Sequence, residues 1–118
     1  MAIYTGVMLT GSANGLPIPV AATATPGTAI HTATGSTTGF DEVYLWASNV
    51  TNATETLTVE WGGVTDPGSH LVKAFSIAPN SPAVVVSPGL RLNNSLAVKA
   101  FCSTASAINV HGFINRNT

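Results

Sequence analysis

Apolar and polar residues alternate along much of this chain with a period of two, the spacing typical of strands with one buried face. The alternation is clearest in Glu42–Gly62, which has a polar turn near its middle. Its odd-numbered apolar residues share one face: Val43, Leu45, Ala47, Leu57, Val59 and Trp61. The pattern predicts a β-hairpin that buries these residues. Tyr44 and Trp46 then point to the outer face, where two aromatic side chains need cover from a second sheet or a neighbouring subunit.

A second predicted hairpin joins Ser95–Ser103 to Ala107–Asn115, with its turn between them. Its apolar residues are all even-numbered: Leu96, Val98, Ala100, Cys102, Ile108, Val110, Gly112 and Ile114. Pairing even with even residues places the remaining large side chains together on the opposite face: Lys99, Phe101, His111 and Phe113. Aromatic residues again occupy a face that would otherwise meet solvent.

The first forty residues are less regular. Residues 1–10 could form a strand, and residues 16–20 carry two prolines that a central strand does not tolerate, so this segment is an edge strand or an extended arm. We therefore divide the single domain, residues 1–118, into an N-terminal strand plus an extended arm rich in Pro, Thr and Gly (1–39) and a main sandwich (40–118). Such an arm would lie on a neighbouring subunit or shell, and a plain surface loop is the alternative.

The fold expected from these patterns is all-β. Further short strands are predicted at residues 28–33, 70–77 and 83–87, which gives about eight strands with no helical period. We predict an antiparallel β-sandwich of jelly-roll-like organisation. An immunoglobulin-like sandwich is the first alternative, although its Cys…Trp…Cys spacing is missing, and a small barrel is the second.

Charged residues make up 8% of the chain, against about 25% in typical domains, and the net charge is −1. A soluble monomer normally covers its surface with charge, so this composition favours a protein that hides surface against its own copies or a larger assembly. The alternative is a monomer with a surface of uncharged polar residues. Four basic residues are too few for a nucleic-acid surface, and no apolar run is long enough to span a membrane. The single cysteine and the lack of a secretory signal indicate synthesis in a cytoplasm.

The sequence offers little support for a metal site or a cofactor, and we expect neither. Three histidines lie on separate predicted strands, without the close spacing of zinc ligands: His31, His70 and His111. A calcium site formed by acids from two loops, Asp41 and Glu42 with Asp66, is the remaining alternative.

Catalytic patterns are equally weak, and we expect no enzyme. Glu60 could pair with Glu42 or Glu55 as in a glycoside hydrolase, but any β-sandwich with five acids offers such a pair. Asp66, Ser69 and His70 form a Ser–His–Asp set in composition only, because no nucleophile elbow surrounds the serine.

Three segments carry a resemblance to a known class of proteins. They are VYLWASNVTNATETLTVEWGGVTDP, VVVSPGLRL and LAVKAFCSTASAINVHGFINR, and they cover about residues 43–116. Together they resemble small structural proteins of tailed bacteriophages, of the kind encoded near the major capsid protein. The resemblance implies a β-sandwich that decorates and cements the outside of an icosahedral capsid, as a trimer or, alternatively, a dimer, and it implies no catalytic residue.

We therefore expect a virion structural protein on the capsid surface, with the major capsid protein and its own copies as partners. Residues expected to make oligomer or capsid contacts are Ile3, Tyr4, Leu16, Ile18, Tyr44, Trp46, Phe101 and Phe113. One alternative is another virion component, such as a head–tail joining, tail or fibre protein. Another is a carbohydrate-binding β-sandwich that uses Tyr44 and Trp46, flanked by Thr58, as a platform.

Overall fold

The computed structural model describes residues 3–118. Its regular secondary structure within these residues consists of β-strands. Its strands are β1 (Tyr4–Val7), β2 (Ile18–Pro19), β3 (Thr28–Thr32), β4 (Phe40–Asn49), β5 (Glu55–Trp61), β6 (His70–Ile77), β7 (Val84–Leu92), β8 (Ala97–Cys102) and β9 (Ile108–Asn117). They form two antiparallel sheets packed face to face, so the predicted all-β sandwich is confirmed.

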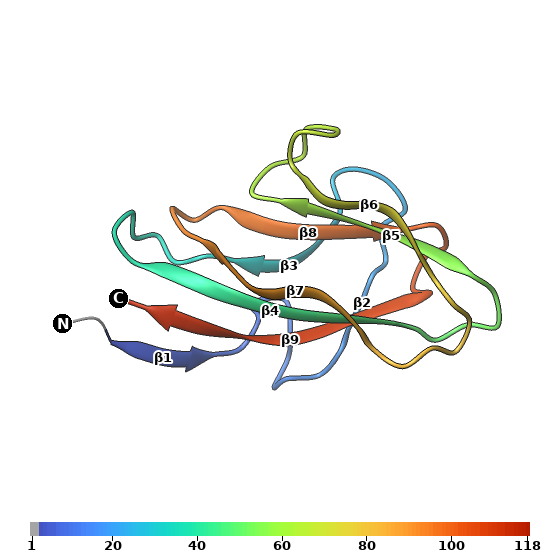
Figure 1. Cartoon of the computed structure of the whole chain (residues 1–118), viewed down its shortest axis with the longest axis horizontal. Helices are drawn as coiled ribbons and strands as arrows, with labels where there is room; N and C mark the ends of the chain where they lie inside the picture. The colour runs from blue at the N-terminus through green and yellow to red at the C-terminus, as the bar shows by residue number, and fades with distance from the viewer. Residues whose placement is uncertain (1–2) are drawn as a thin grey trace.

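The two sheets form the two layers of an elongated molecule of 48 × 28 × 20 Å (Figure 1). Sheet A has the order β1-β9-β4-β7, and β2 also pairs with β9. Sheet B has the order β3-β8-β5-β6. The longest strands, β4 and β9, are neighbours at the centre of sheet A, with Tyr44 opposite Phe113 and Trp46 opposite His111.

The two predicted hairpins are wrong as pairings. β4 pairs with β7 and β9, whereas β5 pairs with β6 and β8, so the chain passes from one sheet to the other between Asn49 and Glu55. It does so again between β8 and β9. Alternation identifies the face on which a residue lies but carries no information about which strand lies beside it. β5 and β6 are the consecutive strands that pair with each other.

The predicted buried faces are confirmed even though the pairings are not. Val43 and Leu45 on β4 and Leu57 on β5 are at most 1% exposed and lie on the inner faces of opposite sheets. The even-numbered apolar residues of β8 and β9 are buried in the same way. Two predicted core residues are exceptions: Leu96, just before β8, is 41% exposed, and Trp61, at the end of β5, is only partly buried. The side chains predicted to face inward therefore meet across the sandwich rather than along a hairpin.

The N-terminal segment is an edge strand and not an arm. β1 and β2 lie on the same edge of β9, with Val7 opposite Ile114 and Ile18 opposite Val110, so they form one interrupted strand. Ile18 and Val20 are 5% and 0% exposed. Because these side chains complete the core of this domain, the segment cannot extend onto a neighbour without uncovering it.

The residues inserted between β1 and β2 close one open side of the sandwich. Gly11 N donates a hydrogen bond to Ile30 O (2.9 Å), and Thr32 N donates one to Thr10 Oγ1 (2.8 Å). Leu9, within the same insertion, is 1% exposed. The insertion thus joins the β1 side of sheet A to β3 at the edge of sheet B. Within residues 3–118 there is no helix that could cross a membrane.

Candidate functional site

The outer face of sheet A carries a row of aromatic side chains that come from three strands. We call it the aromatic face, formed by Tyr4, Phe40, Tyr44, Trp46 and Phe113. Even-numbered residues of β4 and odd-numbered residues of β9 point to the same side because Tyr44 lies directly opposite Phe113. The period-two pattern predicted both outward faces, and the register of β4 with β9 brings them together.

The rings at the centre of this face are stacked on one another. Tyr44 and Phe113 have centroids 4.7 Å apart and planes inclined by 13°, and Trp46 stacks on Phe113 at 6.0 Å and 28°. The Tyr44 ring also lies close over Gly89, where a Cβ atom would approach Tyr44 Cζ to 2.9 Å. Gly89 has φ +103°, so glycine is required there both by the backbone and by the ring. The aromatic rings are therefore held in fixed positions.

The charged groups at one end of the face are paired with each other. The Arg91 guanidinium lies 4.2 Å from the centroid of Phe40, and its Nη2 is 3.3 Å from Glu42 Oε2. Asn115 Nδ2 donates to the other oxygen of Glu42 (3.1 Å), and Tyr4 packs edge-on against Phe40 at 6.5 Å. A partner that covered this end would bury a neutralised pair and not a free charge.

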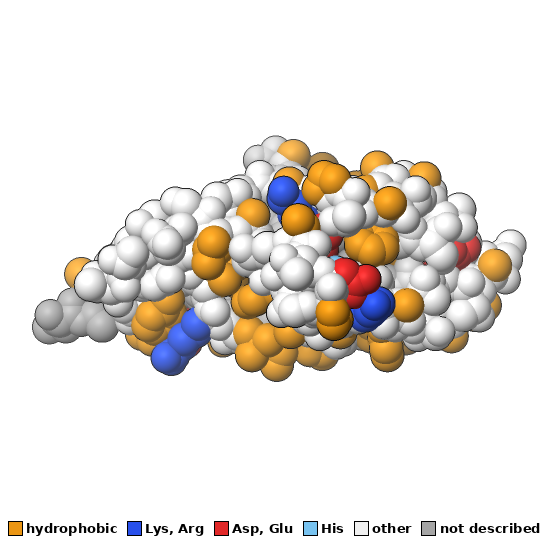
Figure 2. Space-filling model, turned by 90° about the horizontal axis from the view of Figure 1, so that it is seen from above, with side chains coloured by type: hydrophobic (Ala, Val, Ile, Leu, Met, Phe, Trp, Pro, Cys, Tyr) orange, Lys and Arg blue, Asp and Glu red, His pale blue; other side chains and the backbone are white. Residues whose placement is uncertain are grey.

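Large apolar side chains remain exposed across this face. Tyr4 and Phe113 are each 49% exposed, and Val85, which lies opposite Trp46 on the neighbouring strand β7, is 60% exposed. A surface of this composition marks an interaction site. On the side of the molecule on which β5, β6 and β8 lie, hydrophobic side chains are scattered among backbone and uncharged polar groups, and charged groups are few (Figure 2). The low charge of the sequence is thus visible at the surface.

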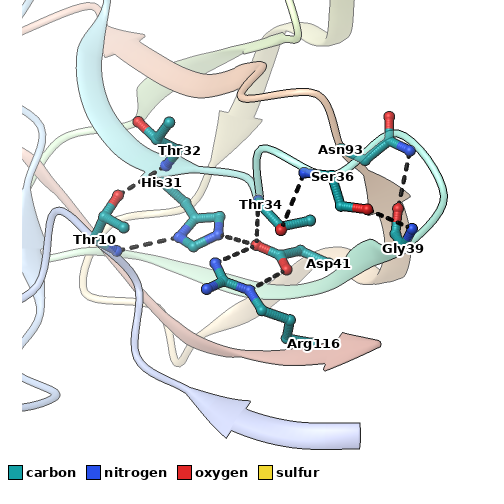
Figure 3. Close-up of polar contacts among 9 residues, drawn as sticks. All are labelled: Thr10, His31, Thr32, Thr34, Ser36, Gly39, Asp41, Asn93 and Arg116. Atoms are coloured by element: carbon teal, nitrogen blue, oxygen red, sulfur yellow. Dashed lines mark hydrogen bonds and ion pairs between the residues drawn. The ribbon is translucent and has the colours of Figure 1, made fainter. Parts of the chain in front are cut away.

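A polar cluster inside the sandwich connects four segments (Figure 3). His31 Nε2 donates to Asp41 Oδ2 (2.7 Å), and Arg116 binds the same carboxylate through Nε (2.7 Å) and Nη2 (2.9 Å). Thr10 N donates to His31 Nδ1 (3.1 Å), so this nitrogen is unprotonated and the ring is neutral. The side chains of His31 and Asp41 have no exposed surface, so no ligand can reach these two groups, whereas the Arg116 side chain is 28% exposed.

Burial and pairing shift the pKa values of this cluster in defined directions. Burial lowers the pKa of His31, against the raising effect of its hydrogen bond to Asp41. Burial alone would raise the pKa of Asp41, but hydrogen bonds from Arg116 and His31 outweigh it and the pKa is lowered. The hydrogen bond to Asp41 raises the pKa of Arg116. The folded protein therefore favours a neutral histidine beside an ionised Asp–Arg pair.

The other expected contact residues do not join the aromatic face as a group. Ile18 is a core residue at 5% exposure, so its assignment to a contact surface is wrong. Phe101 lies on β8 in sheet B, where it packs edge-on against His70 at 6.4 Å, and so it is not beside Phe113. Ile3 and Leu16 are exposed, at 59% and 61%.

Sequence reasoning missed several members and neighbours of the aromatic face. Phe40 has the same parity as Tyr44 and Trp46, so the alternation would have found it if the strand had been started two residues earlier. Arg91 and Val85 had no such signal, because only the pairing of β7 with β4 places them beside the rings.

The residues considered for a calcium site and for a catalytic carboxylate pair lie apart in the fold. Asp41 is enclosed with Arg116, while Asp66 is half-exposed and bonded to Lys73 (2.7 Å), so the two acids do not form one calcium site. Glu42 and Glu60 belong to different sheets and are not a carboxylate pair. His70 Nδ1 lies 3.6 Å from Asp66. Within residues 3–118, no three His, Cys, Asp or Glu side chains gather closely enough to hold a metal ion.

The fold and the site define a β-sandwich protein with an exposed, rigid aromatic face on one sheet. Comparisons with protein families, with curated proteins and with solved structures found no match. Function is therefore argued from this chain's own residues.

Proposed function

We propose that this protein is a structural component of a virion, a decoration or cement protein that binds the outside of a phage capsid and stabilises it. The partner would be the major capsid protein, and the aromatic face of sheet A would make the contact. Two separate arguments support the proposal. One is the resemblance of residues 43–116 to phage structural proteins, and the other is the exposure of Phe113 and its neighbours on a charge-poor protein.

The aromatic face is the observation that carries the proposal. Clustered aromatic residues beside an arginine are the usual source of binding energy at protein interfaces. Stacking of Tyr44 and Trp46 on Phe113 restrains these side chains before binding, which reduces the entropy lost when a partner covers them. Because Arg91 and Glu42 are paired with each other, a partner that covers this end would bury no unpaired charge.

The strand order is consistent with a more specific form of the sandwich, the jelly roll. If β1 and β2 are counted as one interrupted strand, the nine strands reduce to eight in two four-stranded sheets, and most connections cross between the sheets. Jelly rolls occur in viral capsid proteins and in lectins. The topology therefore supports a virion protein without distinguishing it from a sugar-binding one.

The geometry of the rings favours a protein partner over a carbohydrate. A sugar platform needs an open aromatic face against which a pyranose ring can stack. Here Tyr44 and Trp46 each stack on Phe113, and Tyr44 also packs over Gly89. These contacts occupy both faces of the Tyr44 ring and one face of the Trp46 ring, which reduces the open ring surface on which a sugar could stack.

The test is binding of purified protein to empty shells of the major capsid protein encoded by the same genome. Trp46→Ala is expected to weaken co-sedimentation about 10- to 30-fold, as for an interface hot spot, with a smaller effect on the melting temperature. Phe75→Ala is the matched control, because Phe75 is 47% exposed but lies on sheet B. Unchanged binding by a destabilised Trp46→Ala protein would contradict the assignment. Labelling of intact particles at the tail and not the shell would instead favour a tail or joining protein.

A further inference from the structure

The outer edge of β1 has backbone groups that face away from the molecule. Thr118 N donates to Ile3 O (3.0 Å), so Ile3 directs its backbone groups toward β9. Backbone direction alternates along a strand, so Thr5 also faces β9, whereas Tyr4 and Gly6 point their N–H and C=O groups outward. The hydrogen bonds of β1 within residues 3–118 all go to the β9 side. Tyr4, Thr5 and Gly6 are all exposed.

The other sheet edges carry features that block the addition of a strand. β2 contains Pro19, and β7 contains Pro88 together with two irregularities in its pairing with β4. β3 is covered by the insertion through Gly11. β6 carries the exposed Lys73 and has Ala74 at φ 50°. β1 has no proline, charged residue or pairing irregularity, so nothing in this strand blocks the addition of another strand at its outer edge.

We propose that β1 pairs antiparallel with β1 of a second copy, about a two-fold axis at Thr5. In this register Tyr4 lies opposite the partner's Gly6 on one side of the axis, and Gly6 opposite the partner's Tyr4 on the other. Both residues direct their backbone groups outward, so each such pair exchanges two hydrogen bonds. The same strand supplies both sides of the contact, as a closed two-fold interface requires.

The side chains fit this register. A Cβ atom built at Gly6 meets nothing within 4 Å, so there is open space over this residue. The 49%-exposed ring of Tyr4 can cover the partner's Gly6, as aromatic residues do beside strand glycines. Ile3 and Met8, 59% and 58% exposed, add apolar area at the two ends. Residues 3–9 carry no charge, so two copies would not repel each other.

The pairing would extend sheet A across two molecules and place two aromatic faces on one surface, because Tyr4 and Phe40 lie on the same side of the sheet. A repeating target would then be bound by both copies at once, which strengthens binding without new contacts. β1 has only 4 residues, so its contact is shorter than a standard interface and dimerisation in solution should depend on protein concentration. The inference does not depend on what the aromatic face binds.

Cross-linking tests the register. Opposed Thr5 residues would form a non-hydrogen-bonded pair with Cα atoms about 4.5 Å apart, within disulfide range. Thr5→Cys should therefore give a disulfide dimer at least tenfold faster than Gly6→Cys, whose copies would lie beyond that range. The native Cys102 is buried and should not interfere. Equal rates for the two variants, or no dimer with Thr5→Cys, would overturn the proposed pairing.

A second test blocks the edge without altering the fold. Gly6→Pro removes an outward N–H that β9 does not use, so the monomer should fold and fail to dimerise by sedimentation velocity at concentrations where the wild type does. Gly6→Ala is the control and should still dimerise. Trp46→Ala should dimerise like the wild type, which separates this inference from the proposed capsid contact. Dimers of Gly6→Pro at the wild-type concentration would show that another surface is responsible.

Discussion

Asp41 and Glu60 are both completely buried carboxylates, but they are stabilised differently. Asp41 is neutralised by Arg116 and accepts further hydrogen bonds from His31 and from Thr34 N (3.1 Å). Glu60 accepts hydrogen bonds from the Thr25 hydroxyl and from Gly27 N (2.7 Å). Buried charges require such partners, because an unpaired one costs several kcal/mol. Each carboxylate therefore fixes the chain segment that supplies its donors.

Removing the charge of Asp41 should be strongly destabilising. Asp41→Asn leaves Arg116 without its bidentate partner, and we expect a loss of about 3–5 kcal/mol in the free energy of unfolding, the cost of breaking a buried pair. Glu42→Gln, at the exposed pair with Arg91, is the control and should cost less than about 1 kcal/mol. Urea unfolding measures both. Similar losses for the two variants would contradict the structural role of Asp41.

The stability of the protein should fall as the pH drops below about 6.5, the ordinary pKa of histidine. Burial lowers the pKa of His31 in the folded state, so below pH 6.5 the unfolded state takes up a proton that the folded state resists. The free energy of unfolding then decreases by up to about 1.4 kcal/mol per pH unit until the lowered pKa is reached. Asp41, whose pKa is also lowered, contributes stability above about pH 3.9 that is lost below it.

Urea unfolding between about pH 7.5 and 4 measures this dependence. His31→Gln keeps a donor toward Asp41 but does not titrate, so its curve should be flatter than that of the wild type between pH 6.5 and 5. Identical curves for the wild type and His31→Gln would exclude His31 as the source.

At the scale of the elements, β9 organises sheet A. It pairs with β1 and β2 on one side and with β4 on the other, and it supplies Arg116 to the inner cluster and Phe113 to the outer face. Gly112, which directly precedes Phe113 on β9, lies opposite Leu45. A Cβ atom at Gly112 would come within 1.8 Å of Tyr44 O, so only glycine allows β4 and β9 to approach as they do.

Gly112→Ala should therefore disrupt the centre of sheet A. The added Cβ meets backbone and not a movable side chain, so we expect a loss of more than about 3 kcal/mol or failure to fold. Gly6→Ala is the control, because its Cβ meets nothing within 4 Å, and it should change stability by less than about 0.5 kcal/mol. Thermal unfolding followed by circular dichroism measures both. Equal melting temperatures for the two variants would contradict the pairing of β4 with β9.

In the molecule as a whole, the small number of charged residues leaves few unpaired charges at the surface. The chain has four basic and five acidic residues, and several of them are used in pairs within the fold: Arg116 with Asp41, Lys73 with Asp66, and Arg91 with Glu42. Few charges remain to repel other molecules. Association of such a protein with any partner would depend mainly on apolar contact.

Binding through the aromatic face should accordingly be insensitive to salt. Raising NaCl from about 0.05 to 0.5 M screens exposed charges, and we expect the dissociation constant for capsid shells to change by less than about twofold. Ammonium sulfate should strengthen binding, because it favours apolar burial. Co-sedimentation at each salt concentration is the measurement. A tenfold loss of affinity in NaCl would indicate an electrostatic contact and a different binding surface.

The class of fold, and the face on which most side chains lie, could be predicted from the residue pattern alone. Period-two alternation made Val43 and Leu57 inward-facing and Tyr44 and Trp46 outward-facing, because successive residues of a strand point to opposite sides. Prolines restricted residues 16–20 to an edge, and β2 lies at one. These properties depend on local backbone geometry, so they can be predicted from a short stretch of sequence.

Which strands are neighbours could not be predicted from the residue pattern and follows from the packing of the whole chain. Residues close in sequence, such as those of β4 and β5, lie in different sheets, and residues far apart, such as Tyr44 and Phe113, stack together. The partners of Asp41 and the separation of Phe101 from Phe113 follow from the same pairing. The same alternation is compatible with a hairpin and with a connection that crosses between the sheets, since both bury the same side chains. The choice between them depends on how all the strands pack around one core, which no single segment encodes.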